Sequence, residues 1–107
     1  MSLRAPIAVP VELRADARRA FRLAWNIGED GLRLAGDAPF ESGRIVEARF
    51  QLPGGDALAL ALRARITAGG PDREVADEPG DLAFVEPPGE ARVALHRYVI
   101  ERLGLPR

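Results

Sequence analysis

Hydrophobic residues recur at every second position in long stretches of this sequence, and this alternation limits its fold more than any other feature. The clearest run is residues 46–52, in which Val, Ala, Phe and Leu alternate with Glu, Arg and Gln. Further runs of the same kind cover residues 9–13, 21–27, 32–34, 58–66 and 82–84. Successive side chains of a β-strand point to opposite faces, so each run predicts a strand with one apolar face. Such strands are typical of an antiparallel sheet or a small barrel.

The apolar faces of two of these strands predict core residues. In the run 21–27 the core face is expected to carry Phe21, Leu23, Trp25 and Ile27, so we predict that Trp25 is buried. The longest core stripe is expected from the alternate residues of 58–66, which are Leu58, Leu60, Leu62, Ala64 and Ile66.

Residues that favour turns separate the runs. Gly, Pro, Asn, Asp and Ser gather at residues 28–31, 42–43, 53–56, 69–72 and 78–81. The group 53–56 lies between two strong strands and predicts a tight hairpin. Residues 73–77 form a weaker segment that fits an edge strand or a loop. No internal repeat or linker is present, so we expect one domain over residues 1–107.

After Pro87-Pro88-Gly89 the spacing of the apolar residues changes from every second position to that of a helix. The apolar residues of this last segment are Ala91, Leu95, Tyr98, Val99 and Leu103. Gly104 and Pro106 end the segment. We expect one amphipathic helix of about three to four turns that covers an open end or side of the barrel. His96 lies beside the apolar stripe and is expected to be a partly exposed surface residue.

Composition excludes several classes of function. The 107 residues carry a net charge of −1, which does not favour binding of a nucleic-acid polymer, and no apolar run approaches about 20 residues, so no membrane span is expected. No secretory leader is recognisable, and we expect a cytoplasmic location.

Cysteine is absent and His96 is the one histidine, which leaves no catalytic triad and no multi-histidine metal site. The carboxylates are scattered, so we expect no enzymatic activity. The few aromatic residues fall mostly on apolar faces, which argues against an OB-like barrel that stacks bases.

The order of these elements resembles the PilZ domain family. The segments that carry the resemblance are residues 4–13, 26–34, 43–50, 80–84 and 98–102. PilZ domains are bacterial β-barrels that bind the second messenger cyclic di-GMP. The resemblance implies a mainly β protein, a six- to seven-stranded antiparallel barrel with one C-terminal helix.

The ligand motif of the family is only partly kept. Family members carry an RxxxR arm before the first strand and a [D/N]xSxxG turn between the second and third strands. Residues 26–31 keep Asn26 and Gly31, but Gly28 occupies the serine position, and Arg4 matches the second arginine of the arm. Glu29 and Asp30 place two carboxylates near the expected phosphates. By the resemblance, the arginine would grip guanine edges and phosphates, and the Asn would bond a guanine.

The first arginine of the arm would fall before Met1. Either residues 1–3 are a leader left by expression, or the protein begins with half of the arm, and the sequence leaves both explanations open. Residues 14–18 and 18–22 also spell RxxxR, but they follow the first strand and are interpreted as coincidence.

Two functions follow. In the first, the domain is a non-catalytic receptor that needs no cofactor or metal and binds cyclic di-GMP to act on an effector protein. The residues implied for the ligand are Arg4, Asn26, Gly28, Gly31 and Arg33, with Arg22 as another possible helper. In the second, a PilZ-like domain has lost the ligand and binds proteins through exposed apolar surface, for example in motility. The turn at 26–31 also fits a hairpin without ligand, in which Gly28 and Gly31 supply positive φ.

Overall fold

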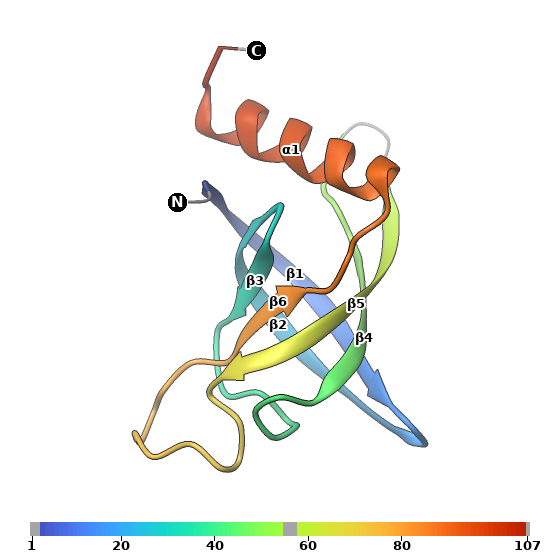
Figure 1. Cartoon of the computed structure of the whole chain (residues 1–107). Helices are drawn as coiled ribbons and strands as arrows, with labels where there is room; N and C mark the ends of the chain where they lie inside the picture. The colour runs from blue at the N-terminus through green and yellow to red at the C-terminus, as the bar shows by residue number, and fades with distance from the viewer. Residues whose placement is uncertain (1–2, 55–57, 107) are drawn as a thin grey trace.

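The chain folds into a closed six-stranded barrel with one helix at its end. A computed structural model describes residues 3–54 and 58–106. The strands are β1 (Arg4–Ala15), β2 (Arg18–Gly28), β3 (Gly31–Leu34), β4 (Ile45–Gln51), β5 (Ala59–Ala68) and β6 (Asp81–Phe84), and the helix is α1 (Gly89–Leu103). Figure 1 shows α1 across one end of the barrel and the loop between β5 and β6 at the other end. The predicted antiparallel barrel and C-terminal helix are confirmed.

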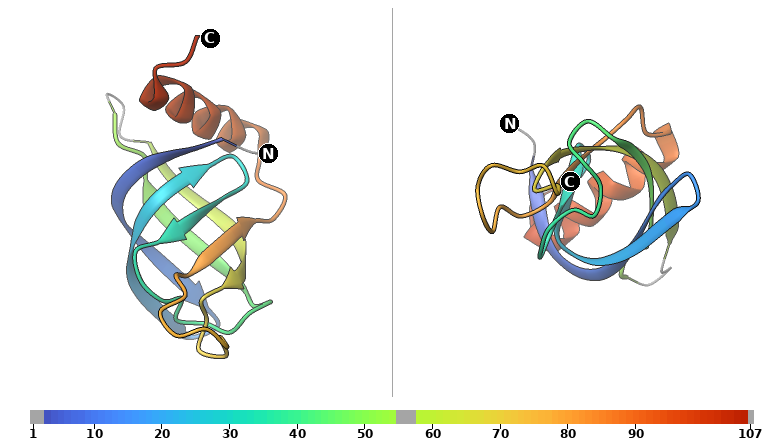
Figure 2. Two further views of the ribbon diagram at one scale, coloured as in Figure 1. Left: turned by 90° about the vertical axis from the view of Figure 1, so that its left-hand side faces the viewer. Right: turned by 90° about the horizontal axis from the view of Figure 1, so that it is seen from below.

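The strands follow one another around the barrel in the order β1-β2-β3-β6-β5-β4, and every neighbouring pair is antiparallel. The barrel closes where β1 meets β4, with Leu13 opposite Ala48. The right-hand view of Figure 2 looks into this ring from the end opposite the helix. Closure pairs both edges of the sheet, so it removes the exposed strand edges that promote aggregation.

Alternating apolar residues fill the barrel interior. The largest fully buried side chains are Phe40, Leu13, Ile27, Leu32, Leu34, Ile66, Leu82, Leu95 and Val11. Within the longest predicted stripe, Leu62, Ala64 and Ile66 are buried, Leu60 is partly buried, and Leu58 precedes β5 and is 44% exposed. Leu95 comes from α1, so the helix completes the core at the open end, as the sequence predicts.

The predicted core face of β2 is wrong over most of its length. Phe21, Leu23 and Trp25 point outward, whereas Ala24 and Ile27 are buried. The pairing with β3 shifts between Ala24 and Asn26, so the strand changes phase there and Ile27 returns to the interior. Since the interior is already occupied by large residues of the other strands, it accepts Ala24 and excludes the aromatic rings.

The loops and the helix end largely match the predictions. Residues 73–77 form a loop and not an edge strand. The β4–β5 hairpin is confirmed by the pairing of Gln51 with Ala59, although residues 55–57 of its turn lie outside the described residues. Gly104 ends α1 in the left-handed conformation that favours glycine.

Candidate functional site

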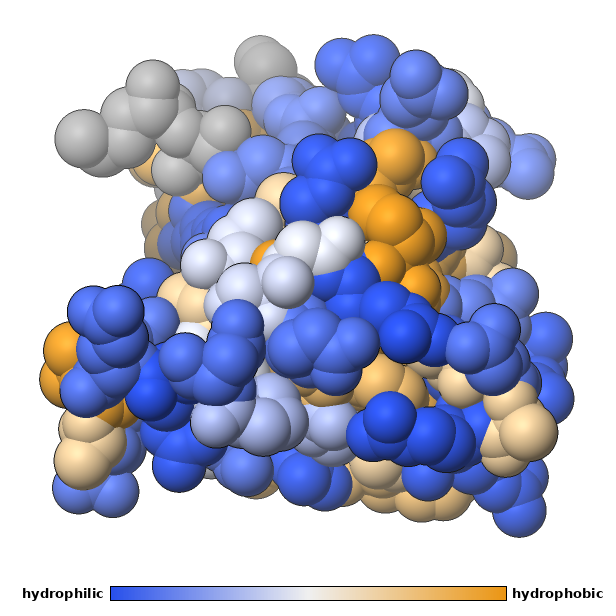
Figure 3. Space-filling view, turned by 60° about the horizontal axis from the view of Figure 1, so that its bottom comes forward, coloured by the Kyte–Doolittle hydropathy of each residue, from blue (hydrophilic) through white to orange (hydrophobic). Residues whose placement is uncertain are grey.

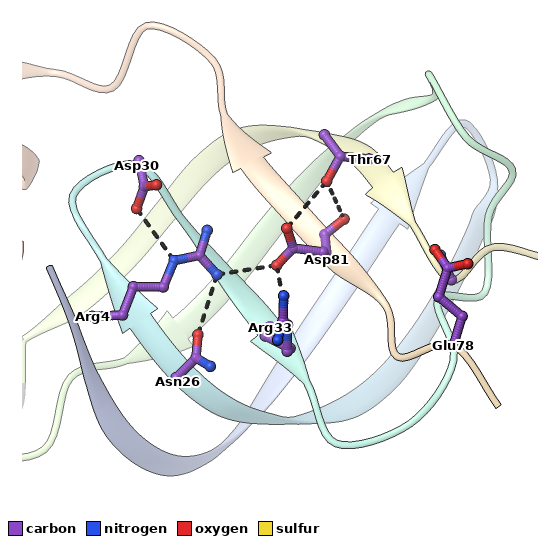
Figure 4. Close-up of polar contacts among 8 residues, drawn as sticks. Arg4, Asn26, Asp30, Arg33, Thr67, Glu78 and Asp81 are labelled. Atoms are coloured by element: carbon purple, nitrogen blue, oxygen red, sulfur yellow. Dashed lines mark hydrogen bonds and ion pairs between the residues drawn. The ribbon is translucent and has the colours of Figure 1, made fainter. Parts of the chain in front are cut away.

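Strands β1, β2 and β3 bring the predicted ligand residues to one side of the barrel, and β6 adds Asp81. Arg4 is the first residue of β1 and pairs with Gly28 at the end of β2, while Asn26 pairs with Arg33 of β3. Asp81 is the first residue of β6 and pairs with Arg33. Figure 4 shows Asn26, Asp30 and Asp81 around the Arg4 guanidinium, with Arg33 and Thr67 beside Asp81. We call Arg4, Asn26, Asp30, Arg33, Thr67 and Asp81 the Arg4 cluster.

The Arg4 guanidinium is occupied by partners from within the domain. Its Nε donates to Asp30 Oδ1 at 3.3 Å, and its Nη1 donates to Asn26 Oδ1 at 3.2 Å and to Asp81 Oδ1 at 3.0 Å. Arg4 is therefore tied to β2, to the β2–β3 turn and to β6 at once. Two of the three guanidinium nitrogens, Nε and Nη1, therefore already bond partners within the domain, and a guanine or a phosphate would compete with them.

Asp81 is the second centre of the cluster. Arg33 Nε lies 3.8 Å from its Oδ1, and Thr67 Oγ1 donates to its backbone carbonyl at 3.0 Å and to its Oδ2 at 3.4 Å. Both carboxylate oxygens thus have partners in the domain.

Charge within the cluster is balanced. Burial, the largest single influence, lowers the pKa of Arg4, but the hydrogen bond and charge of Asp81, with those of Asp30, outweigh it and raise that pKa above its ordinary value. The side chains of Arg4 and Asp81 are each only 23% exposed, so water screens their contact weakly. Two arginines face two aspartates, which leaves no net charge for an anion.

The two glycines of the turn allow close backbone approach. Neither Gly28 nor Gly31 has positive φ, so that expectation is wrong. A Cβ on Gly28 would lie against the carbonyl oxygen of Leu3, and a Cβ on Gly31 against that of Leu82, both well inside the closest distance that real Cβ atoms show. The residue at the family's serine position is therefore glycine because the chain entering β1 fills the space beside it.

The structure corrects the placement of the predicted arginines. Arg4 belongs to β1 and does not lie in an arm before the first strand. Arg22 bonds the carbonyl of Asp37 and is not part of the cluster. Arg14 and Arg18 flank the β1–β2 turn, as expected for an RxxxR spacing unrelated to the motif.

Sequence reasoning missed Asp81 and Thr67. They lie more than forty residues from Arg4 and Asn26 in the chain, and no spacing connects them. Only the register of β3, β5 and β6, which pairs Asp81 with both Arg33 and Ala68, shows that Asp81 reaches the cluster.

His96 is an exposed surface residue, as predicted. Its Nδ1 lies 2.9 Å from Glu29 Oε2, and Tyr98 donates to the carbonyl of Pro6 at 3.0 Å. These two contacts attach α1 to the β2–β3 turn and to β1. His96 therefore joins the helix to the barrel.

Within residues 3–54 and 58–106, no group of three or more His, Asp or Glu side chains is placed to hold a metal ion. No helix there is long and apolar enough to cross a membrane.

Comparison with known proteins identifies the type of barrel. No family model matches the chain, and no curated protein matches it by sequence. The solved structure of the Bacillus subtilis inhibitor of motility, MotI/DgrA, superposes on all of this chain with a TM-score of 0.80 and 20% sequence identity. The chain spans about half the length of that protein, 53%. This similarity to a PilZ-domain protein confirms the PilZ-like barrel as the fold of this chain.

Proposed function

We propose that this chain is a non-catalytic, PilZ-like regulatory domain that acts by contact with other proteins in the bacterial cytoplasm and does not use cyclic di-GMP as its ligand. The observation that supports this proposal is the state of Arg4. Its guanidinium already bonds Asn26, Asp30 and Asp81. In this proposal the hydrogen bonds and ion pairs of the Arg4 cluster hold β1, β2, β3 and β6 together, and we call this role a latch.

The electrostatics of the cluster favour the latch. A cyclic dinucleotide carries two negative phosphates, and it would have to displace Asp30 and Asp81 from Arg4 before it gained any charge-assisted bond. Breaking one partner away from a partly buried pair leaves the other charge uncompensated. Glu29, next to Asp30, adds a further carboxylate to the same turn, where it contacts His96.

The neighbour in structure supports a regulatory role. MotI/DgrA is described as an inhibitor of motility. We extend to this chain the proposal that it controls an effector protein, with motility as the first process to examine.

Cyclic di-GMP reception is the second candidate, and one observation favours it. Arg4, Asn26, Gly28, Gly31 and Arg33, which the resemblance to PilZ domains implies for the ligand, lie at neighbouring positions of β1, β2 and β3. A ligand would bind there if its contacts with both arginines were more favourable in free energy than the loss of the two ion pairs was unfavourable.

Calorimetric titration with cyclic di-GMP at moderate salt, with GTP as the control ligand, distinguishes the two candidates. We expect no heat of binding up to high ligand concentration. Selective binding at micromolar concentration would contradict the proposal. In that case Arg4→Ala should abolish binding and Arg65→Ala, a change at an exposed arginine of β5 outside the cluster, should not.

A further inference from the structure

Three large apolar side chains lie in a row on the outer face of β2. Phe21 is 59% exposed, Leu23 is 48% exposed and Trp25 is 59% exposed, and we call these residues the β2 stripe. Pro10 of β1, also exposed, is paired with Leu23 and widens the stripe on one side. The left-hand view of Figure 2 shows β1, β2 and β3 on the near side of the barrel.

The β2 stripe is large for a domain of this size. Each aromatic ring leaves roughly 100–150 Å² in water, so the stripe with Leu23 exposes on the order of 350 Å². An apolar patch of this area is comparable to the largest patch of a typical monomer, which is often functional. By contrast, the face drawn in Figure 3 is mostly hydrophilic, with small hydrophobic groups between polar residues.

Charge changes sign from one end of β2 to the other. Arg18 and Arg19 begin the strand and are exposed, and Glu29 and Asp30 follow its last residue. The stripe lies between them, with Leu23 near its middle. The pattern along β2 is therefore basic, then aromatic, Leu and aromatic, then acidic.

We infer that the β2 stripe binds a second copy of this chain, related by a two-fold axis that passes near Leu23. A two-fold interface brings residue i against residue j and j against i. Here it sets Phe21 of one copy against Trp25 of the other, and the basic start of each β2 against the acidic turn of its partner. Sheets that pack face to face keep their strand directions within about 30°, which fits two antiparallel β2 strands.

The area fits a weak dimer. Two stripes bury on the order of 700 Å², and flanking residues such as Pro10 bring the total to about 1,000 Å², which is the lower end for specific interfaces. Self-association is therefore expected in the micromolar range or weaker.

Nearby ion pairs argue against a polyanion as the occupant. Arg19 lies 3.6 Å from Glu12, Arg22 3.5 Å from Asp37 and Arg33 3.8 Å from Asp81. Single-stranded nucleic acid binds to aromatic platforms that lie within a positively charged groove. Each of these arginines has a carboxylate nearby, so the surface around the β2 stripe is of mixed charge and is not the uniformly positive groove that a polyanion needs.

Trp25 is the one tryptophan of the chain, so its fluorescence reports on the stripe directly. We would measure sedimentation velocity and Trp25 emission from about 10 µM to about 1 mM, the range of weak association. We expect a monomer–dimer equilibrium and a blue shift of the emission as the dimer forms. A monomer at every concentration, with unchanged emission, would overturn the inference.

Two sets of variants locate the interface. Leu23→Asp sets two carboxylates against each other at the axis and should weaken the dimer at least about tenfold. Val93→Asp, at a 58% exposed position on α1, is the matched control and should leave it unchanged. Loss of the dimer in the Val93 variant alone would assign the interface to α1 and overturn the inference.

A charge exchange tests the symmetry. Arg19→Glu should weaken the dimer, and adding Glu29→Arg should restore it, because the two residues meet across the axis. These exposed substitutions do not enter the core, and circular dichroism checks that each variant is folded. If the double variant is no stronger than Arg19→Glu alone, the proposed antiparallel two-fold arrangement is wrong. The test does not depend on whether cyclic di-GMP binds.

Discussion

Arg4, which the resemblance to PilZ domains implies as a ligand contact, is bonded within the fold of this chain. It bonds Asn26, Asp30 and Asp81, and it is only 23% exposed. A residue in this position is expected to contribute to stability, whatever it does for a ligand. The two predictions at this scale concern Arg4 and the glycine beside it.

Arg4→Met should lower the free energy of unfolding by about 1–3 kcal/mol, because it removes three hydrogen bonds and leaves Asp81 and Asp30 without their main cation. Thermal or urea denaturation measures the change. Arg65→Met on β5 is the matched control and should stay within about 0.5 kcal/mol of the parent chain. Equal stability of the two variants would show that the Arg4 cluster is not a latch.

Gly28→Ser restores the serine of the family motif and should not restore a ligand site. The new Cβ would meet the carbonyl oxygen of Leu3, so the start of β1 must move. We expect a loss of about 1–3 kcal/mol, comparable to overpacking in a core, and no gain in cyclic di-GMP affinity. Gly36→Ala, where the added methyl meets nothing, is the control. A stable Gly28→Ser variant that binds the dinucleotide would support the second candidate function.

At the scale of elements, one apolar face of α1 packs on the barrel, and polar contacts that include those of His96 and Tyr98 lie beside it. Ala91, Leu95 and Val99 are buried, whereas Val93 on the other face is exposed. The contacts of His96 with Glu29 and of Tyr98 with Pro6 lie at the edge of this face. Packing, and not the polar contacts, should therefore hold the helix in place.

Leu95→Ala should destabilise the protein by about 2–5 kcal/mol, because the cavity left beneath α1 opens into the barrel core. Val93→Ala should change stability by less than about 0.5 kcal/mol. Chemical denaturation of the two variants checks this difference. A similar small effect of both would mean that α1 does not close the core.

At the scale of the whole molecule, the closed ring predicts one cooperative unit. Every strand has two paired neighbours, and the core cluster includes residues of all six strands and of α1. Small domains of this kind usually unfold in one step. A chelator should leave the unfolding unchanged, since the described residues hold no metal-binding group.

The prediction is that far-ultraviolet circular dichroism and near-ultraviolet circular dichroism give one melting temperature, with and without EDTA. Two separate transitions would show that α1 or part of the barrel unfolds independently. A fall in melting temperature with EDTA would reveal a bound metal.

Much of the fold could be predicted from local patterns. Alternation of residues 46–52 and 62–66 predicts strands with a buried face, and the helical spacing of Ala91, Leu95 and Val99 predicts α1 with the face that it buries. These patterns succeed because one side of each element is apolar and the other is polar. Gly104 marks the helix end because the left-handed conformation favours glycine.

The candidate site was predicted in part. Arg4, Asn26 and Arg33 do converge, and the resemblance to PilZ domains identified them. What Arg4 bonds could not be predicted, because Asp81 reaches it only through the register of β3 with β6. Residues far apart in sequence carry no spacing that relates them.

Strand β2 shows what the local sequence pattern predicts and what depends on the tertiary structure. Its alternation by itself determined that residues 21–27 lie in a strand, because the period of two belongs to the strand itself. Which of its two faces points inward depended on the space that the other strands leave inside the barrel. That space admits Ala24 and turns Phe21, Leu23 and Trp25 outward, so only the closed tertiary structure decided that this chain carries an exposed aromatic stripe.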